Sequence, residues 1–138
     1  MGRIVGMGVD IVQNARIESI LKNRGERFLR RAFHPEEIRV FRSKTGDKAT
    51  QFLASRWAVK ESFFKALHRN SPTKLDVHFP SICILNDNTG APVLSSTQES
   101  NSITKLLQSL KIDDVHIAIS HERDYTIANV LMQSHEKE

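Results

Sequence analysis

The order of hydrophobic and polar residues along the chain predicts both strands and helices. Strands are indicated where β-branched residues gather between turn-forming glycine, asparagine and aspartate. The clearest turn runs from Asn86 to Gly90, separates two short apolar runs and predicts a hairpin. The predicted strands are residues 3–12, 81–86, 91–95, 114–120 and 125–132.

Helices are indicated where apolar residues recur with the spacing of one helix face. Ile103, Leu106, Leu107 and Leu110 form such a stripe, and Pro35 followed by two glutamates marks a helix start. The predicted helices are residues 14–23, 25–31, 35–41, 47–69 and 98–110, with Asp47 as the cap of the longest. This order predicts an α+β fold, with helices packed on a small antiparallel sheet, in one domain spanning residues 1–138.

Composition narrows the class of protein. The chain has 138 residues, of which 39% are hydrophobic and 26% charged, as in an ordinary globular domain. No apolar run approaches the ~20 residues that cross a bilayer, so no membrane partner is expected. Because Cys83 is the single cysteine, an internal disulfide and a cysteine-based metal site are both excluded. A reducing, intracellular setting is expected, either the cytoplasm or the mitochondrial matrix.

Charge points to an anionic partner. The formal net charge is +4 and the sequence pI is near 9.5, which favours nucleic acid, phosphorylated small molecules or an acidic protein. One basic stretch is interrupted only by Glu26, Glu36 and Glu37. It is either a solvated helical face or a surface that recruits an acidic partner. Its basic residues are Arg24, Arg27, Arg30, Arg31, Arg39, Arg42 and Lys44.

Asp10 is the first candidate for chemistry. It lies near the end of the first predicted strand, where alternation places Gly6, Gly8 and Asp10 on one face. Two glycines beside a carboxylate would leave the backbone open to close approach by a ligand. The alternative is a structural aspartate that caps a turn or pairs with a lysine.

The longest predicted helix carries cations on its apolar side. Its main apolar arc is Phe52, Val59, Phe63, Ala66 and Leu67. Arg56 and Lys60 fall inside that arc or at its margin, and a core face normally excludes cations, so they must snorkel or meet an anion. Glu61 and Lys65 lie on another side, four residues apart, where a plain surface ion pair is the alternative to a functional role.

Ser120 and His121 follow the predicted strand at 114–120 and open a tight turn. A histidine there is either a solvated or capping residue or a ligand-binding group. The remaining histidines show no paired metal spacing, so zinc is not expected. No nucleophile-elbow pattern supports a serine hydrolase.

Five motifs, in order over nearly the whole chain, resemble one family. Residues 8–11 (GVDI) with 16–17 (RI) are similar to the opening G-x-D-I…R-I of the holo-acyl-carrier-protein synthases, a small group of 4′-phosphopantetheinyl transferases. Residues 56–62 (RWAVKES), followed by Lys65, resemble the central R-[WF]-x-x-K-E-[AS] motif. The other matches are residues 33–37 (FHPEE), 90–92 (GAP) and 119–121 (ISH). Residues 68–70 (HRN) depart from the Gly-Thr-Gly that usually stands there.

The resemblance implies a reaction and its residues. It implies the 4′-phosphopantetheinyl transferase fold and transfer of 4′-phosphopantetheine from coenzyme A to a serine of an acyl carrier protein. Mg²⁺, with Mn²⁺ as a substitute, is implied to be held by Asp10, Glu61 and the diphosphate of coenzyme A. The resemblance also implies that Glu61 removes the proton of the carrier serine, directly or through a metal-bound water. The implied catalytic residues are Asp10, Glu61 and Lys65, and the implied coenzyme A contacts are Arg56, Lys65, Ser120 and His121.

The same resemblance implies how the chain assembles. Arg16 and Arg24 are implied to dock the acidic carrier protein, and the enzyme is implied to be a homotrimer with its sites between subunits. Strand residues 115–119 and 127–131 are the expected interface, because alternation gives each strand a second face to cover. The alternative is that this face packs under the chain's own helices.

Two other functions compete with this interpretation. A non-catalytic module that docks on an acidic carrier would leave Asp10 and Glu61 without a role. A basic nucleic-acid-binding domain would need a stacking platform, but Phe28, Phe33 and Phe41 in the basic stretch are spaced like core contacts. Nucleic acid is therefore not expected as a partner.

Overall fold

The computed structural model describes residues 2–68, 77–97 and 100–135, which form an α+β fold. Strands β1 (Arg3–Gln13), β5 (Tyr125–Ser134) and β4 (Asp114–Glu122) make an antiparallel sheet in that order. The short strands β2 (Ile84–Asn86) and β3 (Pro92–Leu94) pair as a separate hairpin. The helices are α1 (Asn14–Arg24), α2 (Glu26–Ala32), α3 (Pro35–Arg42), α4 (Gly46–His68) and α5 (Asn101–Ser109), with a 3₁₀ turn, η1, at Phe79–Ser81.

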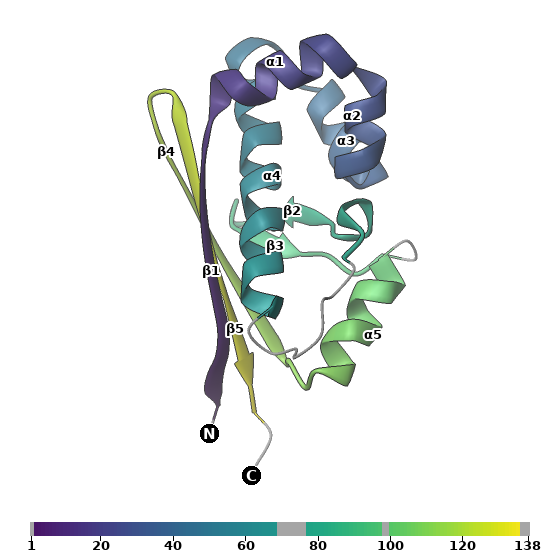
Figure 1. Cartoon of the computed structure of the whole chain (residues 1–138), viewed down its shortest axis with the longest axis vertical. Coiled ribbons are helices and arrows are strands. Elements are labelled where there is room, and N and C mark those ends of the chain that lie inside the picture. Colours follow the sequence, from purple (N-terminus) through teal and green to yellow (C-terminus); the bar gives the residue numbers. More distant parts are fainter. Residues whose placement is uncertain (1, 69–76, 98–99, 136–138) are drawn as a thin grey trace.

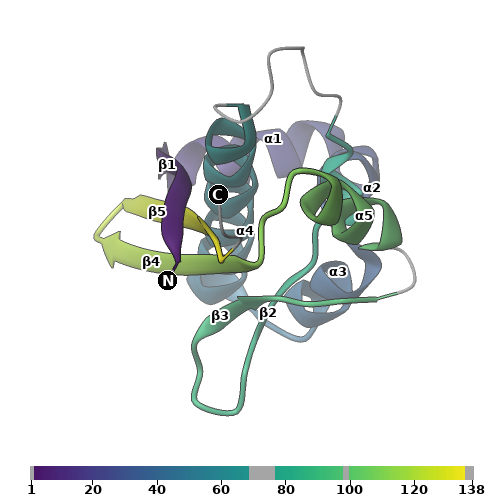
Figure 2. The same ribbon diagram turned by 90° about the horizontal axis from the view of Figure 1, so that it is seen from below.

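Helix α4 is the central element. It runs along one face of the sheet, α1, α2 and α3 gather beside its first half, and α5 lies near its far end (Figure 1). Seen from below, the three-stranded sheet lies on one side of α4, and the β2–β3 hairpin and the other helices lie around its remaining sides (Figure 2). Val59, Phe63 and Leu67 of its predicted apolar arc are buried in the core. None of the described helices has the length and apolar character needed to cross a membrane.

The predicted elements are confirmed, with three corrections at their ends. Helix α4 begins at Gly46, so Asp47 lies in its first turn and is not its cap. Strand β2 begins only at Ile84, because the preceding residues form η1 and a short extended link. Strand β4 continues to Glu122, so His121 lies in a strand paired with Thr126 and does not open the turn. The predicted end of α4 at Arg69 falls outside the described residues.

The glycine expected to admit a ligand admits a helix instead. A β-carbon on Gly8 would lie 1.9 Å from the carbonyl oxygen of Ser62 in α4. The Ser62 hydroxyl shares its proton between the carbonyl oxygen of Ala58 in the same helix, at 2.7 Å, and that of Ala128 in β5, at 3.1 Å. Helix α4 therefore lies against the backbone of both strands at this level.

The opposite face of the sheet stays uncovered by the described residues. Met7, Val9, Ile11, Tyr125 and Ile127 point to this face and are between 40% and 63% exposed. The chain's own described helices all pack elsewhere, so they do not cover it. A contiguous apolar surface of this kind is typical of an interaction site.

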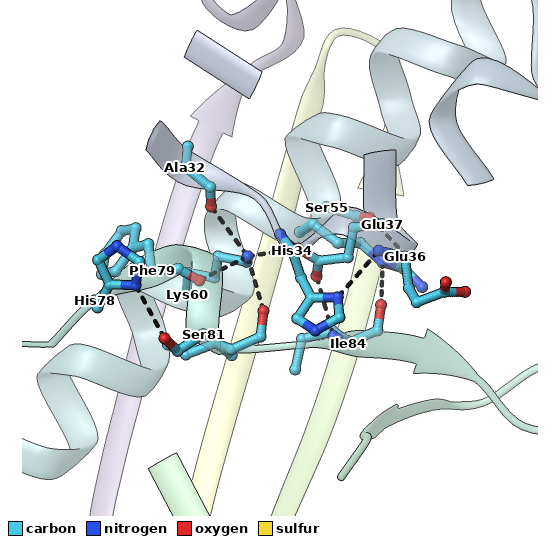
Figure 3. A network of polar contacts seen from close by, with 12 residues as sticks. Ala32, His34, Glu36, Glu37, Ser55, Lys60, His78, Phe79, Ser81 and Ile84 are labelled. Carbon is cyan, nitrogen blue, oxygen red and sulfur yellow. Dashed lines mark hydrogen bonds and ion pairs between the residues drawn. The ribbon is translucent and has the colours of Figure 1, made fainter. Parts of the chain in front are cut away.

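A buried ammonium group joins α4 to the segments around it (Figure 3). Lys60 is completely buried and pairs with the buried carboxylate of Glu37. Its Nζ also donates to the carbonyl oxygens of Ala32 at 3.0 Å, Phe79 at 3.0 Å and Ile82 at 2.9 Å. Of the two outcomes predicted for Lys60, snorkelling to the surface or meeting an anion, the structure shows the second.

Glu37 is fully used by its neighbours. One oxygen also accepts from the His34 backbone N–H at 2.9 Å, and the other accepts from the Ile84 N–H at 3.0 Å. Cys83, beside this network, is buried, and burial, followed by the charge of Glu37, raises the pKa of its thiol to about 12. The network therefore fastens α2, α3, η1 and β2 to α4 with its charges satisfied.

We expect Lys60→Met to destabilise the protein by about 3–5 kcal/mol, because it leaves a buried carboxylate unpaired. The matched control is Arg42→Met, which breaks an ion pair between exposed side chains, Arg42 and Glu26, and should cost at most about 1 kcal/mol. Urea unfolding of both variants measures the difference. Equal losses in the two variants would contradict a central role for the buried pair.

Candidate active site

Asp10 and Glu61 meet where β1 passes α4. Lys65 reaches across from the helix, and its Nζ donates to the carbonyl oxygen of Val9 at 3.0 Å and to Asp10 Oδ1 at 3.1 Å. The pKa of Glu61 is raised by burial and then by the charge of Asp10, whereas Lys65 and Arg16 act in the opposite direction. Lys65 thus crosses to the strand and joins both predicted carboxylates in one cluster.

The donor set of this cluster fits a hard divalent cation. The charge of Asp10 contributes to the raised pKa of Glu61, and a cation between the two carboxylates would favour ionised Glu61. Among the described residues, no group of three or more His, Cys, Asp or Glu side chains is placed to hold a metal. A metal at Asp10 and Glu61 would therefore draw its remaining ligands from water and substrate oxygens, as Mg²⁺ commonly does.

Arg56 forms the centre of a second cluster. Its guanidinium is 4% exposed and lies 4.2 Å from the ring centroid of Phe52. Nε donates to the Ile84 carbonyl oxygen at 3.0 Å, and the two Nη atoms donate to Ser55 Oγ and Asn86 Oδ1, each at 2.9 Å. These acceptors are all neutral. Burial lowers the pKa of Arg56, and the charge of Glu37 offsets this only in part.

His121 faces Arg56 with a defined tautomer. Its Nδ1 lies 2.9 Å from Thr126 Oγ1, and that hydroxyl donates its proton to Asn14 Oδ1 at 2.7 Å. Nδ1 must therefore donate, which leaves Nε2 as the acceptor of the neutral ring. Burial, followed by the charge of Arg56, lowers the pKa of His121. A bound anion would reverse the second effect and favour the protonated ring.

Arg56 and His121 line a cavity of about 230 Å³ together with two lysines that were not predicted as coenzyme A contacts. These are Lys44 and Lys48, and the Lys44 ammonium lies 5.7 Å from the Phe52 ring centroid. A signal was present in the spacing, because Lys48, Phe52 and Arg56 follow one another at i, i+4 and i+8 on one face of the helix.

The two clusters lie on different sides of α4. Arg56 and Glu61 are five residues apart, which separates them by about 140° around the helix, and Arg56 and Lys65 are about 180° apart. Ser120 joins neither cluster, because it stands opposite Ile127 on the uncovered face of the sheet, whereas its neighbour His121 points to the helix side. Within one chain, the Asp10 and Arg56 clusters are therefore separate.

A third cluster lies next to Glu61. An apolar floor of Ile20, Phe28 and Trp57 lines a cavity of about 340 Å³. Trp57 is one helical turn before Glu61, and Arg16 is close enough to affect the pKa of that residue. Two arginines of the basic stretch are instead occupied in ion pairs, Arg39 with Glu36 and Arg42 with Glu26. The arginines around the cavity are Arg16, Arg24, Arg27 and Arg31.

Comparison with known proteins identifies the family of the chain. A profile of the 4′-phosphopantetheinyl transferase superfamily matches residues 6–128. The chain belongs to this superfamily. A curated holo-[acyl-carrier-protein] synthase of Geobacillus sp. (strain WCH70) is 35% identical to it over 130 residues, which are 94% of this chain and 97% of that protein.

Solved structures of transferases from the same superfamily share the fold. The holo-[acyl-carrier-protein] synthase of Neisseria meningitidis matches with a TM-score of 0.80 and 32% identity, over 98% of this chain and 100% of that one. The synthase of Bacillus anthracis str. Ames, in complex with CoA (3′,5′-ADP), matches with a TM-score of 0.73 and 31% identity, over 95% of this chain and 97% of that one. The predicted family and fold are confirmed. Residues 68–70 depart from the Gly-Thr-Gly of the family. Two of them, Arg69 and Asn70, lie outside the described residues.

Proposed function

We propose that the protein is a holo-acyl-carrier-protein synthase, which transfers 4′-phosphopantetheine from coenzyme A to a serine of an acyl carrier protein and releases adenosine 3′,5′-bisphosphate. The observation that carries the proposal is the cluster of Asp10, Glu61 and Lys65, in a chain of this superfamily. A non-catalytic module for an acidic carrier would leave this cluster unexplained, because it gives no reason to keep a half-buried carboxylate, Glu61, beside the charge of a second one, Asp10.

Asp10 and Glu61 are the residues that would hold Mg²⁺, with Mn²⁺ as a substitute, and the ion would neutralise charge on the diphosphate of coenzyme A. Lys65, whose Nζ donates to Asp10, would contact the phosphate that carries pantetheine. The raised pKa of Glu61 suits it to accept the proton of the attacking serine hydroxyl, directly or through a water.

The Arg56 cavity is proposed to bind the nucleotide end of coenzyme A. Within the described residues, no carboxylate forms an ion pair with the buried Arg56 guanidinium, whose acceptors are neutral, and a phosphate would supply a counter-ion. Lys44 and Lys48 add positive charge around the same space. The Nε2 atom of His121 can donate to a phosphate oxygen once the ring is protonated, so it completes the phosphate site.

The first test is intact-mass analysis of an apo acyl carrier protein incubated with the enzyme, coenzyme A and Mg²⁺. The expected result is one added phosphopantetheine group, lost when a chelator removes the metal. Asp10→Ala and Glu61→Gln should each remain folded and lower the rate by at least about 10²-fold, because each removes one of two protein carboxylates from the metal site. Turnover like that of the unmodified enzyme in both variants, at saturating metal, would refute the assignment.

Carrier docking is proposed at the cavity lined by Ile20, Phe28 and Trp57. Its apolar floor with arginines around it fits an acidic helix that carries an apolar side chain. Because Trp57 precedes Glu61 by one turn, a carrier bound there would present its serine near the carboxylates. Arg16 and Arg24 are the arginines proposed from the sequence for this role, and both line the cavity.

Reversing either arginine to glutamate should raise the carrier KM by about tenfold at low salt and leave coenzyme A binding nearly unchanged, because the exchange replaces attraction to the acidic partner by repulsion. The effect should shrink as salt screens surface charge. Arg39→Glu is the matched control, since that guanidinium is already paired with Glu36 outside the cavity. If Arg39→Glu raised the carrier KM as much, the docking surface would lie elsewhere.

A homotrimer with sites between subunits is proposed as the working form. The Asp10 cluster and the Arg56 cluster lie on different sides of α4. A second copy of the chain that brought its Arg56 cluster to the Asp10 cluster of the first copy would complete one site. The apolar face around Val9, Ile11 and Ile127 supplies surface for such contacts. Ser120, on the same face, would then approach the shared site from the interface.

Light scattering should give three times the 15.7 kDa chain mass at assay concentration. Mixing chains that carry Asp10→Ala with chains that carry His121→Ala should restore activity, because some shared sites would then contain both intact residues. Unmixed samples of each variant are the controls. A fully active monomer would contradict the proposal, and a trimer without recovery would place both residues in the same subunit's contribution.

A further inference from the structure

Gly8 lies where the backbone of β1 comes into close contact with the backbone of α4. A β-carbon there would lie 1.9 Å from the Ser62 carbonyl oxygen, 2.8 Å from the Ser62 carbonyl carbon and 3.0 Å from the Ala66 nitrogen. All three are backbone atoms, so rotation of a side chain cannot make room. Gly8 is not among the glycines with positive φ, so the position requires glycine for space and not for backbone conformation.

This contact is centred on the carboxylates. Gly8 precedes Asp10 by two residues on the same face of β1, and Ser62 directly follows Glu61 in α4. The single proton of the Ser62 hydroxyl is shared between the carbonyl oxygen of Ala58 within α4, at 2.7 Å, and that of Ala128, at 3.1 Å, which stands opposite Asp10 in the strand register. Helix and sheet are thus fastened together within two residues of both carboxylates.

We propose that Gly8 and Ser62 are positioning residues that set the separation between the Asp10 and Glu61 carboxylates, and thereby the affinity of the enzyme for its divalent cation. The inference rests on the proposed function, in which both carboxylates hold the ion. Mg²⁺ demands near-ideal octahedral geometry with oxygens at about 2.0–2.1 Å, so a displacement of one ligand by a fraction of that length weakens binding.

Gly8→Ala forces β1 and α4 apart, because real β-carbons essentially never come within 3.0 Å of another heavy atom. The displacement arises two residues before Asp10 in β1 and one residue after Glu61 in α4. It therefore moves Asp10 away from Glu61. We expect Mn²⁺ to bind about tenfold more weakly to this variant in the presence of coenzyme A, as for loss of other groups that orient metal ligands. Free Mn²⁺, followed by electron paramagnetic resonance in a titration, measures the affinity without any turnover.

Val12→Ala is the matched control. Val12 lies on the same face of β1, two residues beyond Asp10, and is 3% exposed. Its truncation destabilises the core by leaving a cavity, but it introduces no clash between strand and helix. We expect its Mn²⁺ affinity to stay within about twofold of the unmodified protein, because removing two methyl groups leaves space and does not push β1 away from α4.

Ser62→Ala provides the test if Gly8→Ala does not fold. It removes the hydroxyl bond to Ala128 and leaves the backbone contact in place, so we expect about threefold weaker Mn²⁺ binding, less than a full displacement causes. Unchanged affinity in every folded variant of Gly8 and Ser62 would overturn the inference, and so would an equal loss in Val12→Ala.

Asp10→Asn separates this inference from the proposed function. If the unmodified protein with coenzyme A binds Mn²⁺ and Asp10→Asn abolishes binding, the metal site stands, and the Gly8 and Ser62 variants decide the positioning role. Should the unmodified protein bind no Mn²⁺, or Asp10→Asn bind it equally well, the proposed metal site itself fails and the inference fails with it.

Discussion

The buried Lys60 ammonium is the interaction on which most of this structure depends. Its four acceptors lie in α2, α3, η1 and the link before β2. All four are distant from Lys60 in the sequence. A buried ion pair is often no more stable than a hydrophobic replacement. Here, however, an apolar side chain would remove the ammonium donor from three carbonyl oxygens, of which that of Phe79 would keep the bond from the Ile82 N–H, so packing alone could not replace the charge.

The same fastening sets the position of the Arg56 cavity. Glu37 holds the backbone N–H of Ile84, and the carbonyl oxygen of Ile84 accepts from Arg56. Arg56 and Lys60 are thus two buried cations one turn apart on α4, and Glu37 is the one buried carboxylate among the described residues. Lys60 forms the ion pair with Glu37. The positive charge left at Arg56 is the physical reason why this cavity suits a phosphate, and it follows from the fold and not from surface charge alone.

The sequence was sufficient for what depends on local pattern and insufficient for what depends on contacts across the chain. Periodicity predicted the elements, and the motifs brought Asp10, Glu61 and Lys65 together before any coordinates. Nothing local could show that Glu37 is the anion for Lys60, since the two are 23 residues apart. For the same reason Gly8 was assigned to a ligand, because its real neighbour, the Ser62 backbone, is defined only by packing. His121 was assigned to a turn because the pairing of β4 with β5 continues through charged residues.

The burial of Cys83 has a consequence for the chemistry that the protein is proposed to handle. Coenzyme A and the phosphopantetheine arm both end in a thiol, and their disulfides exchange with any accessible thiolate. Exchange needs the thiolate form, and the Cys83 thiol, buried and with a pKa of about 12, stays protonated at physiological pH. The chain's single cysteine is therefore inert toward its own substrate and product, so no mixed disulfide should accumulate when the coenzyme A pool becomes oxidised.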